Sequence, residues 1–310
     1  MRLVLLGLLV AANLFAKIPL ALNWKPEPQF GGFYQTQIGQ MAKTAKSDGV
    51  ELEIMPGGAG TPTVQMVAAG KVPFGVASAD EVVLARDRGM LIVALMAVYQ
   101  TNPQGIMTHP ERKLNSIAEV YAQDGTLGIQ RGLGYSLFLE KKYGTTAKVK
   151  RVPYAGGIAP FLADANYSQQ CFVTSEPLLV KKQGKTEKTF LIADAGYNPY
   201  TTVVVAKKDY VEKNGPQVAK VVALLKKSWA AYVANPAAAN EMMHKLNPTM
   251  DPETFQASAE AQKDLIAGGD AKEHGIGYMS EARWKELSEQ LKDLGLVKAV
   301  LPPKEYFQVY

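Results

Sequence analysis

Cysteine and histidine are scarce in this sequence, which has one cysteine, Cys171, and three histidines in 310 residues. A single cysteine excludes an internal disulfide, and no C-x-x-C or H-x-x-x-H spacing offers ligands to a transition metal. The catalytic and phosphate-binding patterns G-x-S-x-G and G-x-x-x-x-G-K-[ST] are also absent. The sequence therefore predicts no cofactor, no metal site and no catalytic residues, and it favours a binding protein over an enzyme.

Charge of one sign is not concentrated anywhere in the chain. The 34 Lys and Arg residues outnumber the 29 Asp and Glu residues, which gives a net charge of +5, and no basic run is longer than two residues. A protein that reads a nucleic-acid backbone needs a basic face or groove. We therefore expect the excess charge to lie on a solvated surface, and we expect no nucleic acid as a partner.

Long apolar runs are also lacking, apart from one at the start of the chain. Met1-Arg2 precedes an apolar run from Leu3 to Ala12, and Leu14-Phe15-Ala16 ends in a small residue. This pattern is typical of a signal peptide over residues 1–16. An uncleaved membrane anchor is the weaker alternative, because the apolar run is too short to span a membrane comfortably. No lipidation cysteine lies at the cleavage site, because Cys171 is far away. We expect an exported periplasmic protein that is not lipidated, with Cys171 as a buried packing residue.

From Lys17 onward, short strand patterns alternate with helix patterns. Strands are predicted at residues 18–22, 50–54, 74–78, 91–99, 126–130, 148–154, 170–174 and 201–206. Beyond Pro216 the pattern is nearly all helix, and one apolar helix face comprises Val218, Val221, Val222, Leu225, Trp229, Tyr232 and Val233. Alternating strands and helices predict an α/β protein with mostly parallel sheets. No Gly/Ser linker separates two halves, which favours two lobes joined by crossing strands with a ligand between them.

Several motifs in order resemble one family. The first is Leu22-Asn23-Trp24-Lys25-Pro26 with Gly32-Phe33-Tyr34, which is similar to the opening pattern L-N/D-W-x-P-x-x-x-x-x-G-x-Y. The others are Pro56-Gly57-Gly58 followed by Val67 to Gly75, Ala85 to Gly89, Tyr167 to Pro177, Gly196 to Tyr200, and Trp229 with Asn235-Pro236. Together they span roughly residues 18 to 245 and resemble the periplasmic binding proteins for thiamine pyrimidine precursors, which are related to the sulfonate- and nitrate-binding proteins of ABC importers.

This resemblance implies a type II periplasmic binding protein fold, with two α/β lobes and the ligand cleft between them. Lobe 1 would comprise residues 17–99 plus 203–310, and lobe 2 would comprise residues 100–202. The crossing strands would lie near Val98–Gln100 and Thr201–Val203. The implied partners are a small-molecule ligand and an ABC permease that recognises the closed form, and we expect the protein to be a monomer.

The same family includes fungal enzymes that build the pyrimidine from their own histidine, with iron and a C-C-C-F-C motif. The position of that motif reads Tyr197-Asn198-Pro199-Tyr200-Thr201 here, and the sacrificial histidine would fall near Asp80-Glu81. Both features are missing. Without a thiolate cluster and a histidine to donate, the synthase reaction is excluded.

The candidate ligand contacts are aromatic, acidic and amide side chains. Trp24 follows a strand, so its ring can stack on a heterocycle, with Tyr197 as the opposing ring. The alternative is ordinary core packing for Trp24 and packing at the hinge for Tyr197. Glu176 can accept hydrogen bonds from ligand N–H groups or simply cap its helix, and Asp80 and Glu81 share this ambiguity. The remaining candidates are Phe30, Tyr34, Ser78, Gln100, Gln130, Tyr135 and Tyr154.

An acidic and aromatic set suits a neutral or cationic nitrogen heterocycle, such as an aminopyrimidine precursor of thiamine. A sulfonate or nitrate would need Arg, Lys or bare helix N-termini. The segment Pro56 to Thr61 and the side chain of Arg131 keep an organosulfonate, taurine or nitrate ligand open, and riboflavin is a further alternative. A secreted enzyme or a sensory domain on the same fold is the alternative of another class.

Overall fold

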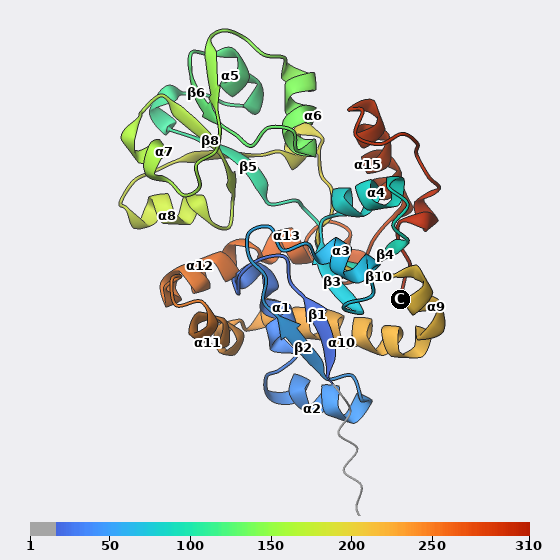
Figure 1. The fold of residues 1–310 in the computed structure, drawn as a ribbon. Coiled ribbons are helices and arrows are strands. Elements are labelled where there is room, and N and C mark those ends of the chain that lie inside the picture. The colour runs from blue at the N-terminus through green and yellow to red at the C-terminus, as the bar shows by residue number, and fades with distance from the viewer. Residues whose placement is uncertain (1–16) are drawn as a thin grey trace, which may run out of the picture.

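The computed structural model describes residues 17–310, so the predicted signal peptide at 1–16 lies outside the described residues. These residues form two separate five-stranded sheets, each flanked by helices (Figure 1). Within residues 17–310, no helix is both long enough and apolar enough to cross a membrane. The α/β class predicted from the alternation of strands and helices is confirmed.

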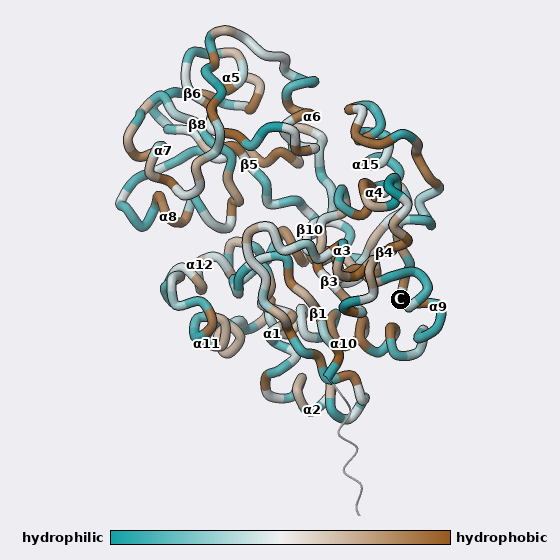
Figure 2. The backbone as a smooth tube through the Cα atoms, in the orientation of Figure 1, coloured by the Kyte–Doolittle hydropathy of each residue, from teal (hydrophilic) through white to brown (hydrophobic). Residues whose placement is uncertain are grey.

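The first sheet has the strand order β2-β1-β3-β10-β4. Its strands are β1 (Ile18–Ala21), β2 (Leu52–Met55), β3 (Phe74–Ala77), β4 (Ile92–Tyr99) and β10 (Thr201–Lys207). β4 is buried along its whole length although it ends the sheet. The C-terminal segment covers it, because the Ala94 N–H donates to the Tyr306 carbonyl at 2.8 Å and the Gln308 N–H donates to the Ala94 carbonyl at 2.9 Å. Figure 2 shows the hydrophobic residues concentrated along these central strands.

The second sheet has the order β7-β6-β8-β5-β9. Its strands are β5 (Gln104–Thr108), β6 (Gly125–Gly128), β7 (Val149–Val152), β8 (Tyr167–Phe172) and β9 (Lys188–Leu191). Each sheet contains antiparallel pairs: β10 runs against β3 and β4, and β5 runs against β8 and β9. The prediction of mostly parallel sheets is confirmed for strand direction, because four strands of each sheet run the same way and only β10 and β5 run against them. The chain enters β5 and β10 directly after crossing from the other sheet. Neither strand is therefore reached through the helical crossover that makes neighbouring strands parallel.

The helices divide between the two sheets. Those of the first sheet are α1 (Gly31–Gln35), α2 (Gly39–Asp48), α3 (Thr63–Ala68), α4 (Ala79–Asp87), α9 (Lys208–Lys213), α10 (Gly215–Ala234), α11 (Ala237–Leu246), α12 (Pro252–Ala261), α13 (Lys263–Ala267), α14 (Ala271–His274) and α15 (Glu281–Asp293). Those of the second are α5 (Ile117–Ala122), α6 (Gly134–Tyr143), α7 (Ala159–Ala163) and α8 (Glu176–Lys182). Short 3-10 turns are η1 (Pro28–Phe30), η2 (Pro110–Arg112), η3 (Ala193–Ala195) and η4 (Pro303–Glu305).

The long helix α10 buries the apolar face predicted for it and fixes the start of the chain. Its Trp229 and Tyr232 side chains are buried against α1. A Cβ atom on Gly31 would overlap the Tyr232 ring, and one on Gly32 would overlap the Trp229 ring. Glycine is required at both positions for this close approach. The contact holds the segment that joins β1 to α1, which carries Trp24.

The chain crosses between the sheets twice, at residues 100–103 and 196–200. The two crossing segments are bonded to each other: the Asn102 N–H donates to the Asn198 side-chain oxygen at 2.8 Å, and the Asn102 amide donates to the Pro199 carbonyl at 3.1 Å. Arg283 adds a hydrogen bond to the Asn198 carbonyl at 2.7 Å and lies over the Tyr200 ring. Two short connections that lie side by side permit hinge bending between the sheets.

Candidate ligand-binding cleft

A cavity of about 460 Å³ lies between the two sheets, beside the crossing segments. Both sheets and their loops contribute to its lining, which comprises Asn23, Trp24, Glu27, Gln29, Phe30, Gln104, Gln130, Tyr154, Gln170, Cys171, Phe172, Ser175, Glu176, Thr201 and Thr202. Five of the residues predicted from the sequence are among them: Trp24, Phe30, Gln130, Tyr154 and Glu176. The size is that of a small-molecule site.

On the side of the first sheet, the wall is the loop that follows β1. The Trp24 side chain is 37% exposed, whereas Phe30 behind it is 2% exposed. Buried amides of the C-terminal helices hold this loop from behind: Asn247 donates to the Pro26 carbonyl at 3.1 Å, and Gln262 donates to the Pro28 carbonyl at 2.9 Å. The Trp24 ring is thus presented on a fixed backbone with much of its surface open.

On the side of the second sheet, Glu176 is held in one orientation. The Tyr154 hydroxyl donates to Glu176 Oε1 at 2.6 Å, and the Phe172 N–H donates to Glu176 Oε2 at 2.8 Å. Burial, followed by the charge of Glu176, raises the pKa of Tyr154, so the phenol keeps its proton and remains a donor. Each oxygen of Glu176 accepts one bond from the protein and retains lone pairs for a ligand.

A second polar cluster lines the same wall around Gln170, which the sequence reasoning did not single out. Gln170 Oε1 accepts hydrogen bonds from the Gln130 N–H at 2.6 Å and from the Tyr135 hydroxyl at 2.5 Å. The Gln170 amide donates to Gln130 Oε1 at 3.0 Å. Tyr135 is not one of the lining residues, but its hydroxyl holds the side chain of Gln170, which is.

The cavity is acidic. Glu27 and Glu176 line it from opposite sides, and none of the described residues that line it is Lys, Arg or His. Burial raises the pKa of Glu27, and repulsion by Glu176 adds to this shift; the hydrogen bond from Trp24 and the charge of Lys25 oppose it. Glu27 falls at a variable position of the first motif and is not among the residues predicted from the sequence.

The structure does not bring Tyr34, Gln100 or Tyr197 to the cavity. Tyr34 is 2% exposed and lies in the core of the first sheet. Gln100 is buried in a crossing segment, where its amide donates to the Tyr278 carbonyl at 3.1 Å. Tyr197 packs on Phe138 with ring centres 5.3 Å apart, and burial, followed by the charge of Asp80, raises the pKa of its hydroxyl. Tyr197 lies in the second crossing segment, so its position agrees with packing at the hinge, the alternative considered for it.

Ser78 and Glu81 also lie outside the cavity lining. They form a capping box at the start of α4, in which Glu81 Oε2 accepts from the Ser78 N–H at 2.8 Å. This pair satisfies a free backbone donor of the helix end. Of the three acids considered from the sequence, only Glu176 lines the cavity, and Asp80 and Glu81 do not.

Thr202 is a lining residue that no sequence signal marked. Its φ is 53°, in the left-handed region that β-branched residues rarely adopt. The residue is 7% exposed and lies where β10 leaves the crossing segment. Backbone strain of this kind costs of order 1–3 kcal/mol and persists where surrounding structure enforces it. Cys171 also borders the cavity and is buried, as predicted.

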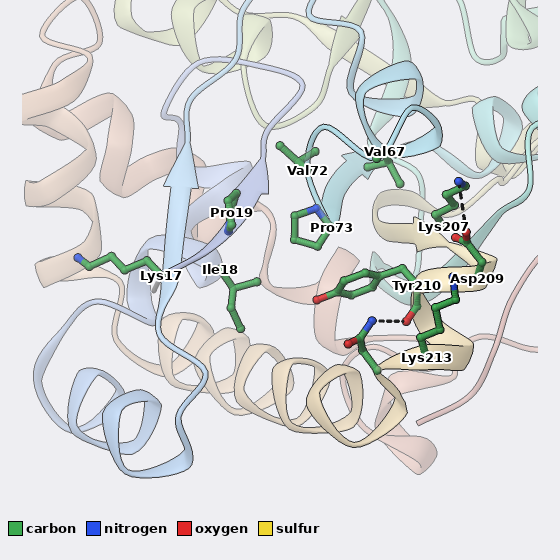
Figure 3. Close-up of a pocket in the computed structure, with 12 residues that line it drawn as sticks. Lys17, Ile18, Pro19, Val67, Val72, Pro73, Lys207, Asp209, Tyr210 and Lys213 are labelled. Atoms are coloured by element: carbon green, nitrogen blue, oxygen red, sulfur yellow. Dashed lines mark hydrogen bonds and ion pairs between the residues drawn. The ribbon is translucent and has the colours of Figure 1, made fainter. Parts of the chain in front are cut away.

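A second cavity of about 420 Å³ lies at the other end of the first sheet (Figure 3). Thr201 at the start of β10 lines the cleft, whereas Lys207 at its end lines this second cavity. Its lining includes Lys17, Lys213 and the ring of Tyr210. All its lining residues belong to the first sheet and its helices, so closure of the two sheets would not enclose a ligand there.

Comparison with known proteins places the chain in a family. The sequence pattern of the family described as NMT1/THI5 like matches residues 46–239. The chain belongs to the NMT1/THI5-like family. This NMT1/THI5-like chain is also 22% identical over 322 residues to the riboflavin-binding protein RibY of Chloroflexus aurantiacus, with 94% of this chain and 84% of that protein covered.

Solved structures show the same fold. The periplasmic aliphatic sulphonate-binding protein SsuA of Escherichia coli superposes with a TM-score of 0.70 at 12% identity, covering 94% of this chain and 92% of that one. SsuA of Xanthomonas axonopodis pv. citri, bound to MOPS, gives a TM-score of 0.66 at 11% identity, covering 95% and 99%. The NMT1/THI5-like chain thus has the two-lobed type II periplasmic binding protein fold that the sequence motifs predicted.

Within residues 17–310, no group of three or more His, Cys, Asp or Glu side chains is arranged to hold a metal ion. Residues 197–201 lie in the second crossing segment and the first residue of β10. They serve packing and hydrogen bonding between the sheets.

Proposed function

We propose that this protein is the substrate-binding component of an ABC importer and that its ligand is an aminopyrimidine precursor of thiamine or a similar flat nitrogen heterocycle. The observation that carries the proposal is the pairing of an open Trp24 ring with an anchored Glu176 carboxylate in one cavity. The ring stacks on a flat heterocycle, and the carboxylate accepts hydrogen bonds from amino or ring N–H groups.

The cycle of capture follows from the hinge. Lobe 1, residues 17–99 plus 203–310, carries Trp24, and lobe 2, residues 100–202, carries Glu176. A ligand that contacts both favours the closed form, and the closed monomer is what an inner-membrane permease recognises in the periplasm. A relative of the same fold from Staphylococcus aureus, with a TM-score of 0.66 at 14% identity, is described as the ligand-binding component of an ABC-type import system.

The test is calorimetric titration with 4-amino-5-hydroxymethyl-2-methylpyrimidine and its formylamino counterpart. We expect saturable binding of at least one of them, quenching of tryptophan fluorescence, and loss of roughly tenfold or more in affinity for Trp24→Ala. Leu133→Ala is the matched control, since Leu133 is an exposed apolar residue outside this cavity. No heat with either pyrimidine, beside clear binding of taurine, would overturn the proposal.

Riboflavin is the second candidate ligand. The relative RibY is described as a riboflavin-binding protein, and an isoalloxazine ring is flat and rich in nitrogen. The sulfonate relatives give less support for their own ligand class, because the described cavity lining contains no basic side chain to meet an anion. The same titration with riboflavin separates the two heterocycles, and tight riboflavin binding without pyrimidine binding would replace the first ligand by the second.

A further inference from the structure

We propose that the cleft selects ligands that carry a positive charge and that Glu27 sets this preference. The inference rests on the proposed function, because it places the ligand in the cavity between the two sheets. It adds the charge of the ligand and a specificity-determining residue that the sequence motifs did not identify.

The first argument is the position of the two carboxylates. Glu27 lies in the loop between β1 and η1, and Glu176 is the first residue of α8, so the two acids line one cavity from opposite sheets. Their charges interact, since Glu176 is among the causes that raise the pKa of Glu27. Closure of the cleft therefore holds two like charges together around the ligand.

The second argument is the lack of a protein cation between them. Among the described lining residues there is no Lys, Arg or His. The charged neighbour Lys25 is exposed to solvent. The side-chain amides of Asn247 and Gln262 donate to the backbone carbonyls of Pro26 and Pro28, so they are already hydrogen-bonded. Glu176 has Tyr154 and the Phe172 N–H as donors, which are neutral groups. Lys25 and the hydrogen bond from Trp24 offset only part of the shift that burial gives Glu27, and no cation lies within the described lining between the two acids.

The third argument is the cost of closing over that charge. A carboxylate that loses water without a partner is strongly unfavourable, and a ligand cation between the two acids removes this cost. A neutral ligand of the same shape leaves the acids to repel each other, and an anion adds a third negative charge. Hydrogen bonds to charged groups are the stronger class, so the preference for a cation is at least about tenfold.

Benzamidine, benzamide and benzoate test this inference, because these flat rings differ in charge and little in shape. We expect the wild-type protein to bind benzamidine at least about tenfold more tightly than benzamide, and benzoate not to bind. Glu27→Gln should reduce the ratio to about threefold or less, mainly by weakening benzamidine. Glu53→Gln is the control, since Glu53 is an exposed glutamate of β2 outside the cavity, and it should keep the wild-type ratio.

Equal affinity of the wild-type protein for benzamidine and benzamide would overturn the inference, as would a Glu27→Gln variant that keeps the full ratio. The absence of benzamidine binding at millimolar concentration would also overturn it. The wild-type ratio decides the charge preference even if the variant does not fold. Failure of the pyrimidine titration alone leaves a benzamidine preference intact, so the two proposals fail separately.

Discussion

An ion pair between Lys182 and Asp251 joins α8 of the second sheet to α12 of the first, and its removal is expected to speed ligand release. Lys182 Nζ lies 2.5 Å from Asp251 Oδ2. Lys182 ends α8, whose first residue is Glu176, and Asp251 caps α12, which packs against η1 and so supports Phe30. Figure 1 shows α8 and α12 facing each other across the two lobes. The pair therefore connects elements that support the two walls of the cavity.

The size of the expected effect on ligand affinity follows from the solvent exposure of the Lys182 and Asp251 side chains. Both side chains are partly exposed, and exposed ion pairs contribute about 0.2–1 kcal/mol. If the pair forms only in the closed state, Lys182→Met should weaken ligand binding by about 1.4- to 5-fold. The loss should fall on the dissociation rate, because the ligand enters the open form before the pair exists.

Stopped-flow fluorescence of Trp24 measures both rates. We expect Lys182→Met to raise the dissociation rate by that factor and to leave the association rate unchanged. Added salt should raise the wild-type dissociation rate toward that of the variant, since salt screens exposed charges. Lys181→Met, one residue away on the same helix and exposed, should behave as wild type. Asp251→Asn is a poorer probe, because Asp251 also accepts a hydrogen bond from the Thr254 N–H at 3.1 Å and caps α12.

Two results would refute this reasoning. If Lys182→Met and Lys181→Met release ligand equally fast, the pair does not stabilise the closed form. If Lys182→Met abolishes binding, the side chain has a role larger than an exposed ion pair can supply.

Three further predictions follow from the same structure. Gly32→Ala should lower the free energy of unfolding by about 1–3 kcal/mol in urea titrations, because its methyl group would overlap the Trp229 ring; an unchanged midpoint would contradict this packing. Cys171 is 1% exposed and burial raises its thiol pKa, so it should react with Ellman's reagent only after unfolding. Burial raises the folded-state pKa of Glu27 above its unfolded value, so its ionisation costs stability as pH rises through the folded pKa. Benzamidine affinity should accordingly fall as pH is lowered through that pKa, and Glu27→Gln should flatten this part of the profile.

The sequence predicted the architecture well where periodicity is strong. The helical spacing of its apolar residues was sufficient to predict the buried face of α10 that contains Val218 and Trp229. The eight predicted strands all correspond to strands of the two sheets. Strands β5 and β9 were missed. β5 mixes glycine and polar residues with apolar ones, and β9 contains a lysine and a threonine and is only partly buried. The sequences of such strands show no clear hydrophobic alternation. Whether they form strands depends on packing against the neighbouring strands of the sheet.

The cleft was partly predictable for a similar reason. Trp24 and Glu176 follow buried strands, and residues at the ends of strands gather at the edge where ligands bind. Tyr197 lies instead in the crossing segment before β10, and it turns inward to pack on Phe138. Gln170 was not selected because it lies within strand β8 and not at its end, and its role depends on Gln130 and Tyr135, which are distant in the sequence. Side-chain direction at a strand end is set by tertiary packing, which a single sequence does not contain.

On the proposed function, this chain and the sulfonate-binding proteins use one fold for ligands of opposite charge. At 12% identity the E. coli SsuA structure still superposes with a TM-score of 0.70, so the fold tolerates very different sequences. Such tolerance is expected, because the fold depends on apolar patterning and close contacts such as Gly32 against Trp229. The charged residues of the described cavity lining are Glu27 in a loop and Glu176 at the start of α8, and exchanging them would change the charge of the cavity without touching the core. Ligand class must therefore be read from the cavity lining rather than from the fold.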